Sequence, residues 1–315
     1  MNLALCRLLV AGFVATSALS AHAAIERIVE KTFTVTNPGT LRIDTSGGSI
    51  KVEAGSDATV KVTARQRIKT DSDTEADELL QKLQLTMEQS GGNVTAIAKY
   101  EKQPLGFRFR NWPPVSVDFI VTVPAAMASE LRTSGGSITV GDLRGRIEAR
   151  TSGGSITVGK AGSSVLADTS GGSITVGSAQ GDVDLDTSGG NIKVGPVAGK
   201  ADLETSGGGI TIESVTSSMR ASTSGGSIRA SIVGALQEDC SLDTSGGSIR
   251  VTVDKAAAFN LDASTSGGSV HADGLTIVLK GEKKPGRSRL AGAVNGGGPT
   301  LKLHSSGGGI DITAR

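Results

Sequence analysis

Cysteine and histidine are scarce in this chain of 315 residues, which limits the chemistry that it can support. Its two cysteines are Cys6 and Cys240, so a chain that loses its first residues cannot form an internal disulfide. Of the three histidines, His271 and His304 lie in different repeats and show no metal-ligand spacing. We therefore expect neither a histidine-based catalytic triad nor a zinc site.

An excess of charge of either sign is also missing. Lys and Arg total 32 against 31 Asp and Glu, and Arg7 is the only one of these in the first 23 positions. A balance near zero gives no support for binding to nucleic acid or to an anionic membrane surface. The sequence has no GxxxxGK[ST] motif, so its many glycines do not indicate a nucleotide-binding loop.

Long apolar runs are limited to LLVAGFVATSAL at 8–19, which is shorter than the roughly 20 residues of a membrane span. This run follows Arg7 and precedes AHA at 21–23, the order of a secretory signal and its cleavage site. Cys6 lies before the run, whereas a lipid-attachment cysteine would follow it. We therefore predict a signal peptide over 1–23 and an exported chain, periplasmic or secreted, with no membrane span after cleavage.

Aromatic residues make up only 3% of the chain, whereas glycines number 44 and recur in a hexapeptide, TSGGSI or a near variant. From Thr133 to Thr265 the hexapeptide recurs in steps of 18 and then 21 residues, and the last variant follows 40 residues later. A fixed period near 20 predicts a solenoid, in which stacked repeats share one core. We expect it to occupy 133–315, with a basic loop insertion near 281–298. The copies begin at Thr45, Thr133, Thr151, Thr169, Thr187, Thr205, Thr223, Thr244, Thr265 and Ser305.

Apolar residues repeated every 18 positions give the register of each repeat. Ile138 and Val140 begin two columns, and Ile147 and Ala149 begin two more. An offset of two residues indicates strands with alternate side chains inside, so each rung should contain two short strands on opposite sheets. We therefore predict an all-β fold, a parallel two-sheet β-solenoid with rungs of 18 to 21 residues. A hexapeptide helix would need an aliphatic residue where Arg144 stands.

The same register predicts what lies inside at the corners of each rung. Cys240 aligns with Ile147 and should be buried, and the Thr of every hexapeptide should also face inward. The two glycines should form a turn that requires positive φ or a close backbone approach. The hexapeptide is therefore interpreted as scaffolding and not as a binding motif. The corner between the two strands should be filled by Leu143, Ala161, Ala179, Val197, Val215 and Val233.

Residues 24–132 follow the repeat pattern less strictly and are predicted to form a capping region. The segment SDTEADELLQKL within it has apolar residues at helical spacing. It predicts a helix near 74–83, with Asp73 or Thr74 as the N-cap. We expect this helix to cover the first open edge of the solenoid, where strand groups would otherwise lack partners.

These features together resemble the bacterial "putative adhesin" family of secreted β-strand repeat proteins. The resemblance rests on TSGGSI and its variants, on SDTEADELLQKLQLTMEQSGGNV, and on AVNGGGPTLKLHSSGGGIDI. It covers nearly all of the chain after the signal segment. It implies a β-solenoid with an adhesin-like or envelope-associated role, and it brings no shared catalytic residues.

One outward surface is chemically uneven. On the second strand of each rung, carboxylates are predicted in adjacent outward columns of three successive rungs. Stacked about 4.8 Å apart they repel one another, and a bound Ca²⁺ ion would relieve the repulsion. The alternative is a solvated face that prevents sheets from stacking; no other cofactor is expected. The residues are Asp168, Asp182, Asp184, Asp186, Asp202 and Glu204.

A second candidate surface contains most of the aromatic residues and lies before the regular repeats. Aromatic and arginine side chains alternate there, which would suit stacking against a partner. The same alternation fits an edge strand with Phe packed inward and Arg solvated. The residues are Phe107, Arg108, Phe109, Arg110 and Trp112.

Rigid repetition without a catalytic set favours an exported, non-enzymatic scaffold that binds a cell-envelope protein or a surface glycan. The alternative is a polysaccharide-acting β-helix enzyme that uses carboxylates and arginines such as Asp184 and Arg220. Ice binding is a third reading, but it needs a flat outward Thr column, and charged residues interrupt the expected one. That column runs Thr139, Thr157, Thr175, Lys193, Thr211 and Arg229.

Overall fold

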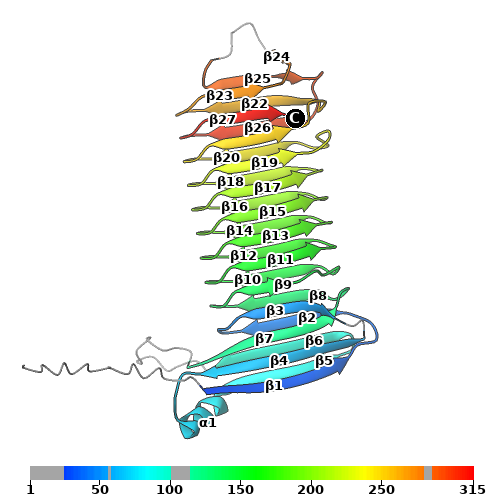
Figure 1. The fold of residues 1–315 in the computed structure, drawn as a ribbon, viewed down its shortest axis with the longest axis vertical. Helices are drawn as coiled ribbons and strands as arrows, with labels where there is room; N and C mark the ends of the chain where they lie inside the picture. The colour runs from blue at the N-terminus through cyan, green and yellow to red at the C-terminus, as the bar shows by residue number, and fades with distance from the viewer. Residues whose placement is uncertain (1–24, 56–57, 101–113, 280–285) are drawn as a thin grey trace, which may run out of the picture.

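The computed structural model describes residues 25–55, 58–100, 114–279 and 286–315. In these residues two large sheets lie face to face and form one tall stack, with a short helix at its N-terminal end (Figure 1). Strands along the middle of both sheets pair in parallel with the strands of the next rung. The predicted all-β, parallel two-sheet solenoid is confirmed.

The first sheet, sheet A, contains 13 strands in the described residues. From the N-terminal end of the stack its order is β1 (Ile25–Thr34), β4 (Thr59–Ile68), β7 (Val115–Pro124), β3 (Ile50–Gly55), β9 (Ile138–Val140), β11 (Ile156–Ala161), β13 (Ile174–Ala179), β15 (Ile192–Val197), β17 (Ile210–Val215), β19 (Ile228–Ile232), β21 (Ile249–Val253), β27 (Ile310–Ala314) and β23 (Val270–Asp273).

The second sheet, sheet B, contains 14 strands within the same described ranges. From the N-terminal end its order is β5 (Leu83–Ser90), β6 (Asn93–Tyr100), β2 (Thr40–Thr45), β8 (Ala128–Thr133), β10 (Ile147–Thr151), β12 (Val165–Thr169), β14 (Val183–Thr187), β16 (Ala201–Thr205), β18 (Met219–Thr223), β20 (Cys240–Thr244), β26 (Thr300–Ser305), β22 (Phe259–Thr265), β25 (Arg289–Val294) and β24 (Ile277–Leu279).

The four apolar columns that begin at Ile138, Val140, Ile147 and Ala149 form the core between the sheets. Each column residue pairs in register with its equivalent in the next rung and is buried. The corner column is also buried from Leu143 as far as Val215.

The corner prediction is wrong at Val233, which is 37% exposed. The register between β17 and β19 shifts after Ile212, so Val215 pairs with Ile232. Ile232, at 3% exposure, therefore fills the corner, and Val233 lies outside.

The hexapeptide Thr side chains face inward, as predicted, and each joins two rungs. Thr169 Oγ donates a hydrogen bond to the carbonyl oxygen of Gly154 in the preceding rung at 2.8 Å. The Thr169 Oγ in turn accepts a hydrogen bond from the backbone N–H of Gly172 at 3.4 Å. This pair of bonds recurs from rung to rung, so the hexapeptide satisfies buried backbone groups at the corner.

The early hexapeptide at Thr45 forms a full rung of the stack. Its strand β2 pairs in parallel with β8, and β3 pairs in parallel with β9. The parallel stack therefore begins with β2, and the predicted boundary near residue 133 marks no break in either sheet. The shared turn chemistry of the hexapeptide explains why this distant segment joins the repeats.

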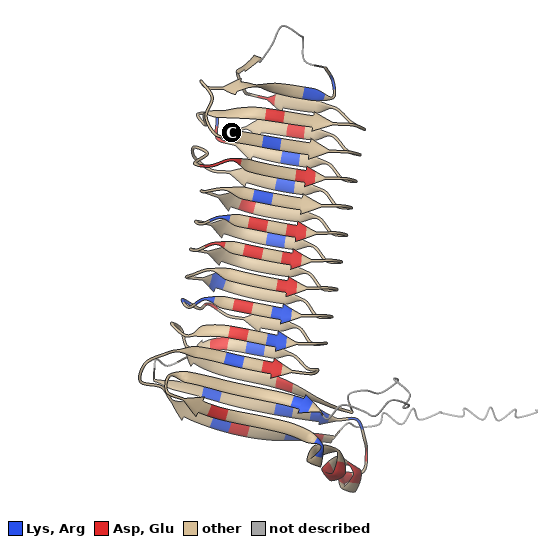
Figure 2. Cartoon of the chain, turned by 180° about the vertical axis from the view of Figure 1, so that it is seen from behind, with Lys and Arg blue, Asp and Glu red and all other residues tan. Residues whose placement is uncertain are grey.

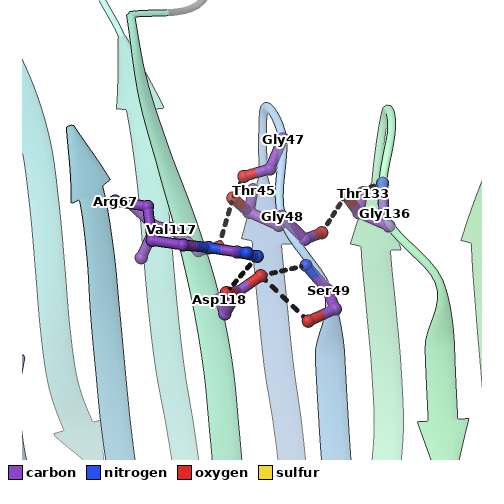
Figure 3. A network of polar contacts seen from close by, with 9 residues as sticks. All are labelled: Thr45, Gly47, Gly48, Ser49, Arg67, Val117, Asp118, Thr133 and Gly136. Atoms are coloured by element: carbon purple, nitrogen blue, oxygen red, sulfur yellow. Dashed lines mark hydrogen bonds and ion pairs between the residues drawn. The ribbon is translucent and has the colours of Figure 1, made fainter. Parts of the chain in front are cut away.

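Strand β7 lies beside this first rung, and Asp118 on β7 ties the two together (Figure 3). Asp118 is 5% exposed and accepts hydrogen bonds from the backbone N–H of Ser49 at 2.7 Å and from its Oγ at 2.9 Å. Arg67 on β4 pairs with the second carboxylate oxygen at 2.5 Å. A Cβ at Gly48, whose φ is +117°, would lie 2.3 Å from the carbonyl oxygen of Val117. The antiparallel strands β4 and β7 are thereby fixed to the parallel stack.

The helix α1 (Asp73–Gln81) begins one residue before its predicted start and ends two residues before its predicted end. Neither predicted N-cap is correct, because the Ser72 Oγ accepts the hydrogen bond from the backbone N–H of Glu75 at 3.4 Å. Ala76 is buried, but most of β1 remains exposed. The helix thus covers only part of the open edge.

The N-terminal end is closed mainly by the antiparallel pairs β1 with β4 and β5 with β6. Lys31 on β1 reaches across to β5, where its Nζ donates a hydrogen bond to the carbonyl oxygen of Met87 at 2.7 Å. The ammonium also lies 5.2 Å from the centre of the Phe33 ring. A charge held between the edge strands opposes the addition of another sheet layer at this end.

At the C-terminal end the rungs are not stacked in sequence order. Strand β26 lies between β20 and β22, and β27 lies between β21 and β23. The last hexapeptide, at Ser305, is therefore inserted between the rungs of Thr244 and Thr265. The predicted loop near 281–298 is wrong in part, because β25 within it pairs antiparallel with β22 and covers an otherwise open strand edge.

Candidate functional site

The outward face of sheet B holds five carboxylates in the predicted adjacent columns. Asp186 pairs in register with Asp168 on one side and Glu204 on the other, and Asp184 pairs with Asp202. All five residues are exposed, and we call them the acidic ladder. Figure 2 shows red bands on successive strands in the middle of the stack, where these residues lie.

Asp182 does not belong to this ladder. It precedes β14 at the corner of the rung, where its Oδ1 accepts a hydrogen bond from the backbone N–H of Lys200 at 2.8 Å. Asp142 makes the equivalent bond to Lys160, also at 2.8 Å. An Asp at this position therefore stabilises the corner of the following rung by accepting a backbone hydrogen bond.

Partial burial and the neighbouring carboxylates change the acidity of two ladder residues, Asp184 and Asp186. Partial burial, followed by the neighbouring Asp202 carboxylate, raises the pKa of Asp184 above its ordinary value. Partial burial also raises the pKa of Asp186, with further contributions from Glu204, Asp168 and Asp184. The ionised forms of Asp184 and Asp186 are thus disfavoured in the folded chain, the condition that a counter-ion or a cationic partner would relieve.

Bound calcium at the ladder stays a prediction. Within the described ranges, no three His, Cys, Asp or Glu side chains are grouped so that they could hold a metal ion. The carboxylates stand in straight columns on an open sheet, whereas Ca²⁺ takes six to eight oxygen ligands around itself.

The charge changes beyond the ladder toward the C-terminal end. Arg220 follows Asp202 in register, and Ser241 and then Lys302 continue the column. Asp184 and Arg220, the pair considered for polysaccharide chemistry, are therefore separated by the strand that holds Asp202.

Sequence reasoning missed one contact of His304. Its Nδ1 lies 3.2 Å from Ser264 Oγ on the neighbouring strand, and Asp243 occupies the register position on its other side. The sequence did not predict this contact because the last rung is inserted between two earlier rungs, and the periodicity does not predict that insertion. His271 contacts only the nearby Ser269, at 2.8 Å between Nε2 and Oγ, in the other sheet.

Cys240 is buried, as predicted, and is 3% exposed. Burial raises the pKa of its thiol, despite an opposing hydrogen bond with the backbone of Met219. A thiol with a raised pKa remains protonated near neutral pH, and the protonated form is a poor nucleophile.

The surface predicted at Phe107, Arg108, Phe109, Arg110 and Trp112 lies outside the described residues, as does the predicted signal peptide. In the part of the chain that is described, no helix has the length and apolar character to cross a membrane.

The family model described as Toastrack DUF4097 matches residues 39–313. The match begins just before β2 and ends in the last strand, so it spans the stack from its first parallel rung. No curated protein matches this chain.

Several solved structures are similar to this chain over most of their length. A "putative adhesin" from Bacteroides fragilis is 13% identical, with a TM-score of 0.41, and the match covers 91% of this chain and 97% of that one. A "putative lipid binding protein" from Parabacteroides distasonis is 14% identical, with a TM-score of 0.44 and the same coverage of both chains. A "putative adhesin" from Parabacteroides merdae is 12% identical, with a TM-score of 0.40, and the match covers 92% of this chain and 97% of that one.

Proposed function

The chain belongs to the Toastrack DUF4097 family, and we propose that it is an exported, non-enzymatic binding scaffold whose sheet B faces a cell-envelope partner. The observation that carries this proposal is the ordered charge on the outward face of sheet B. Side chains there are fixed in register over many rungs, while the residues that hold the stack together are buried.

Two physical features support binding by this face. Parallel strands hold neighbouring side chains about 4.8 Å apart, so a partner meets a surface that is already ordered and loses less free energy on binding. The charge pattern also differs along the stack, from the acidic ladder to the column of Arg220 and Lys302. Such variation gives specificity for one partner and one orientation.

The proposal is tested by sedimentation of the purified chain with isolated cell-envelope fractions. Ser222→Arg places a large cation between Glu204 and Asp243 on sheet B. Thr211→Arg adds the same side chain to the outward face of sheet A and serves as the matched control. We expect the first variant to lower the fraction bound and the second to retain it. An unbound native chain, or equal loss in both variants, would contradict the proposal.

The contact of Ser264 with His304 keeps a polysaccharide-acting enzyme as the alternative function. A hydroxyl activated by an imidazole that is oriented by a carboxylate could act as a nucleophile. Such a hydroxyl would attack an ester carbonyl, form an acyl-enzyme that water hydrolyses, and release the sugar alcohol and the acid. Release of acetate from O-acetylated envelope polysaccharide, lost in Ser264→Ala, would favour this alternative over the scaffold.

A further inference from the structure

The regular surface of sheet B is interrupted by a groove of about 730 Å³ near the C-terminal end of the stack. Its volume falls in the range of about 300–1,000 Å³ that is typical of small-ligand sites. The groove lies over the start of β16, over β18 and β20, and over the start of β26. It coincides with the two places where the repeat becomes irregular, the lengthened rung before β20 and the inserted last rung.

One wall of the groove is the loop between β19 and β20, where the rung grows from 18 to 21 residues. Leu236 in this loop is buried and anchors it to the core. Glu238 Oε2 accepts an ion-paired hydrogen bond from Lys200 Nζ at 2.8 Å, and this bond lowers the pKa of Glu238. Asp239 Oδ1 accepts a hydrogen bond from the backbone N–H of Thr300 at 2.6 Å. Both acids of the loop are therefore already engaged.

Two cations of the groove have no such partner. Arg220 and Lys302 both line the groove. In the described part of the chain, neither side chain forms an ion pair with an Asp or Glu carboxylate. They occupy the same outward column, on either side of Ser241. Strand spacing places their backbones about 10 Å apart, a gap that one bound anion could bridge.

The donors in this column match an oxyanion. A guanidinium can give a carboxylate or sulfate two parallel hydrogen bonds, an ammonium binds it as a point charge, and the Ser241 hydroxyl can donate between them. Ser218 and Thr300 add hydroxyl groups along the groove, and Asp202 adds an acceptor. Hydroxyl donors and a carboxylate acceptor beside an anion site suit a sugar ring that carries both hydroxyls and an acid group.

We propose that this groove binds an acidic glycan, with a carboxylate or sulfate of the sugar held between Arg220 and Lys302 over Ser241. This deepens the proposed function and rests on it, because it names the chemistry of the partner that sheet B recognises. The hydroxyl groups of Ser218, Ser241 and Thr300 along the groove favour a glycan over an acidic peptide.

The test is calorimetric titration of the full exported chain with oligogalacturonate, with an uncharged maltooligosaccharide of equal length and with an oligoglutamate peptide. We expect binding of oligogalacturonate alone. Arg220→Ala combined with Lys302→Ala should weaken it at least about tenfold, because the variant removes both charged donors of the site. Lys193→Ala combined with Arg229→Ala removes two cations from sheet A and should change the affinity less than about twofold.

Circular dichroism and urea unfolding establish that both double variants remain folded. Equal loss in the two double variants would show nonspecific charge attraction and overturn the site. Tighter binding of oligoglutamate would overturn the glycan assignment. If the chain sediments with envelope fractions but binds no oligogalacturonate, the groove proposal fails and the scaffold stands. If it binds neither, both fail.

Discussion

At the scale of single residues, the second glycine of each hexapeptide lies so close to the backbone of the preceding rung that it leaves no room for a Cβ. A Cβ at Gly154 would lie 2.1 Å from the carbonyl oxygen of Gly136, which is backbone and cannot rotate away. A Cβ at Gly153 would lie 3.5 Å from the carbonyl oxygen of Gly135, an ordinary contact. The two adjacent glycines therefore have different roles, and only the second is required by the close approach of neighbouring turns.

This difference predicts unequal effects of two matched substitutions. Gly154→Ala should lower the free energy of unfolding by about 1–3 kcal/mol, because the added methyl must push two rungs apart. Gly153→Ala should change it by less than about 0.5 kcal/mol. Urea unfolding followed by circular dichroism measures both, and equal losses would show that the turn, and not the stacking distance, requires glycine.

The residue pattern predicted which repeat positions are buried, but it did not predict the positions that depart from the repeat. Burial of Thr169 follows from parity alone, because it lies two residues after an inward position. The exposure of Val233 depends on a register shift in a strand pair, and the role of Asp118 depends on a strand that has no hexapeptide. Both depend on how strands distant in sequence pair with one another, which the spacing of the repeats does not predict.

At the scale of strands, parallel in-register pairing places side chains of the same kind next to one another, which stabilises some columns and destabilises others. Apolar columns gain packing, but the acidic ladder places Asp186 beside Asp168 and Glu204. Like charges in directly opposed positions destabilise a sheet by about 0.2–1 kcal/mol per pair. The strands tolerate this cost because the buried columns dominate the stability of the stack.

The ladder gives a pH dependence with a definite sign. The pKa of Asp186 is raised in the folded chain by partial burial and by its acidic neighbours. The folded state therefore binds this proton more tightly than the unfolded state, so stability is lost as pH rises through the raised pKa. At neutral pH, Asp186→Asn should raise the free energy of unfolding by about 0.2–1 kcal/mol, and the gain should vanish as the pH falls below 3.8, the ordinary pKa of an Asp carboxyl.

Glu213→Gln on sheet A is the control, since it makes the same kind of change at an exposed residue outside the ladder. Urea unfolding of both variants across the pH range provides the measurement. A gain for Asp186→Asn that does not depend on pH, or a loss at neutral pH, would show that the carboxylates do not repel one another.

At the scale of the whole molecule, the repeat predicted the architecture but not the order of its layers. Period and parity were sufficient for two parallel sheets, because every rung repeats the same inward positions. They could not show that β26 and β27 enter between earlier rungs, since each hexapeptide carries the same local information. The groove arises at this insertion and at the lengthened rung, so sequence reasoning could name Arg220 but could not place Lys302 in the same column, two strands away.

The two ends of the stack are protected in different ways. Lys31 bridges the edge strands at the N-terminal end, whereas β25 and β24 add antiparallel strands to sheet B at the other. These devices leave the long faces, and not the ends, as the surfaces on which a partner finds an ordered array.

The central claim is that buried hexapeptide residues maintain the fold while outward residues of sheet B bind the partner. It is tested most directly by measuring urea unfolding and envelope sedimentation together for Thr169→Val and for the double variant Arg220→Ala with Lys302→Ala. Thr169→Val leaves the Gly154 carbonyl without its donor, so it should cost about 1–3 kcal/mol of stability and preserve binding by the folded chain. The double variant should keep its stability and lose binding. A stable Thr169→Val chain that no longer binds, or a double variant that binds normally, would contradict this account.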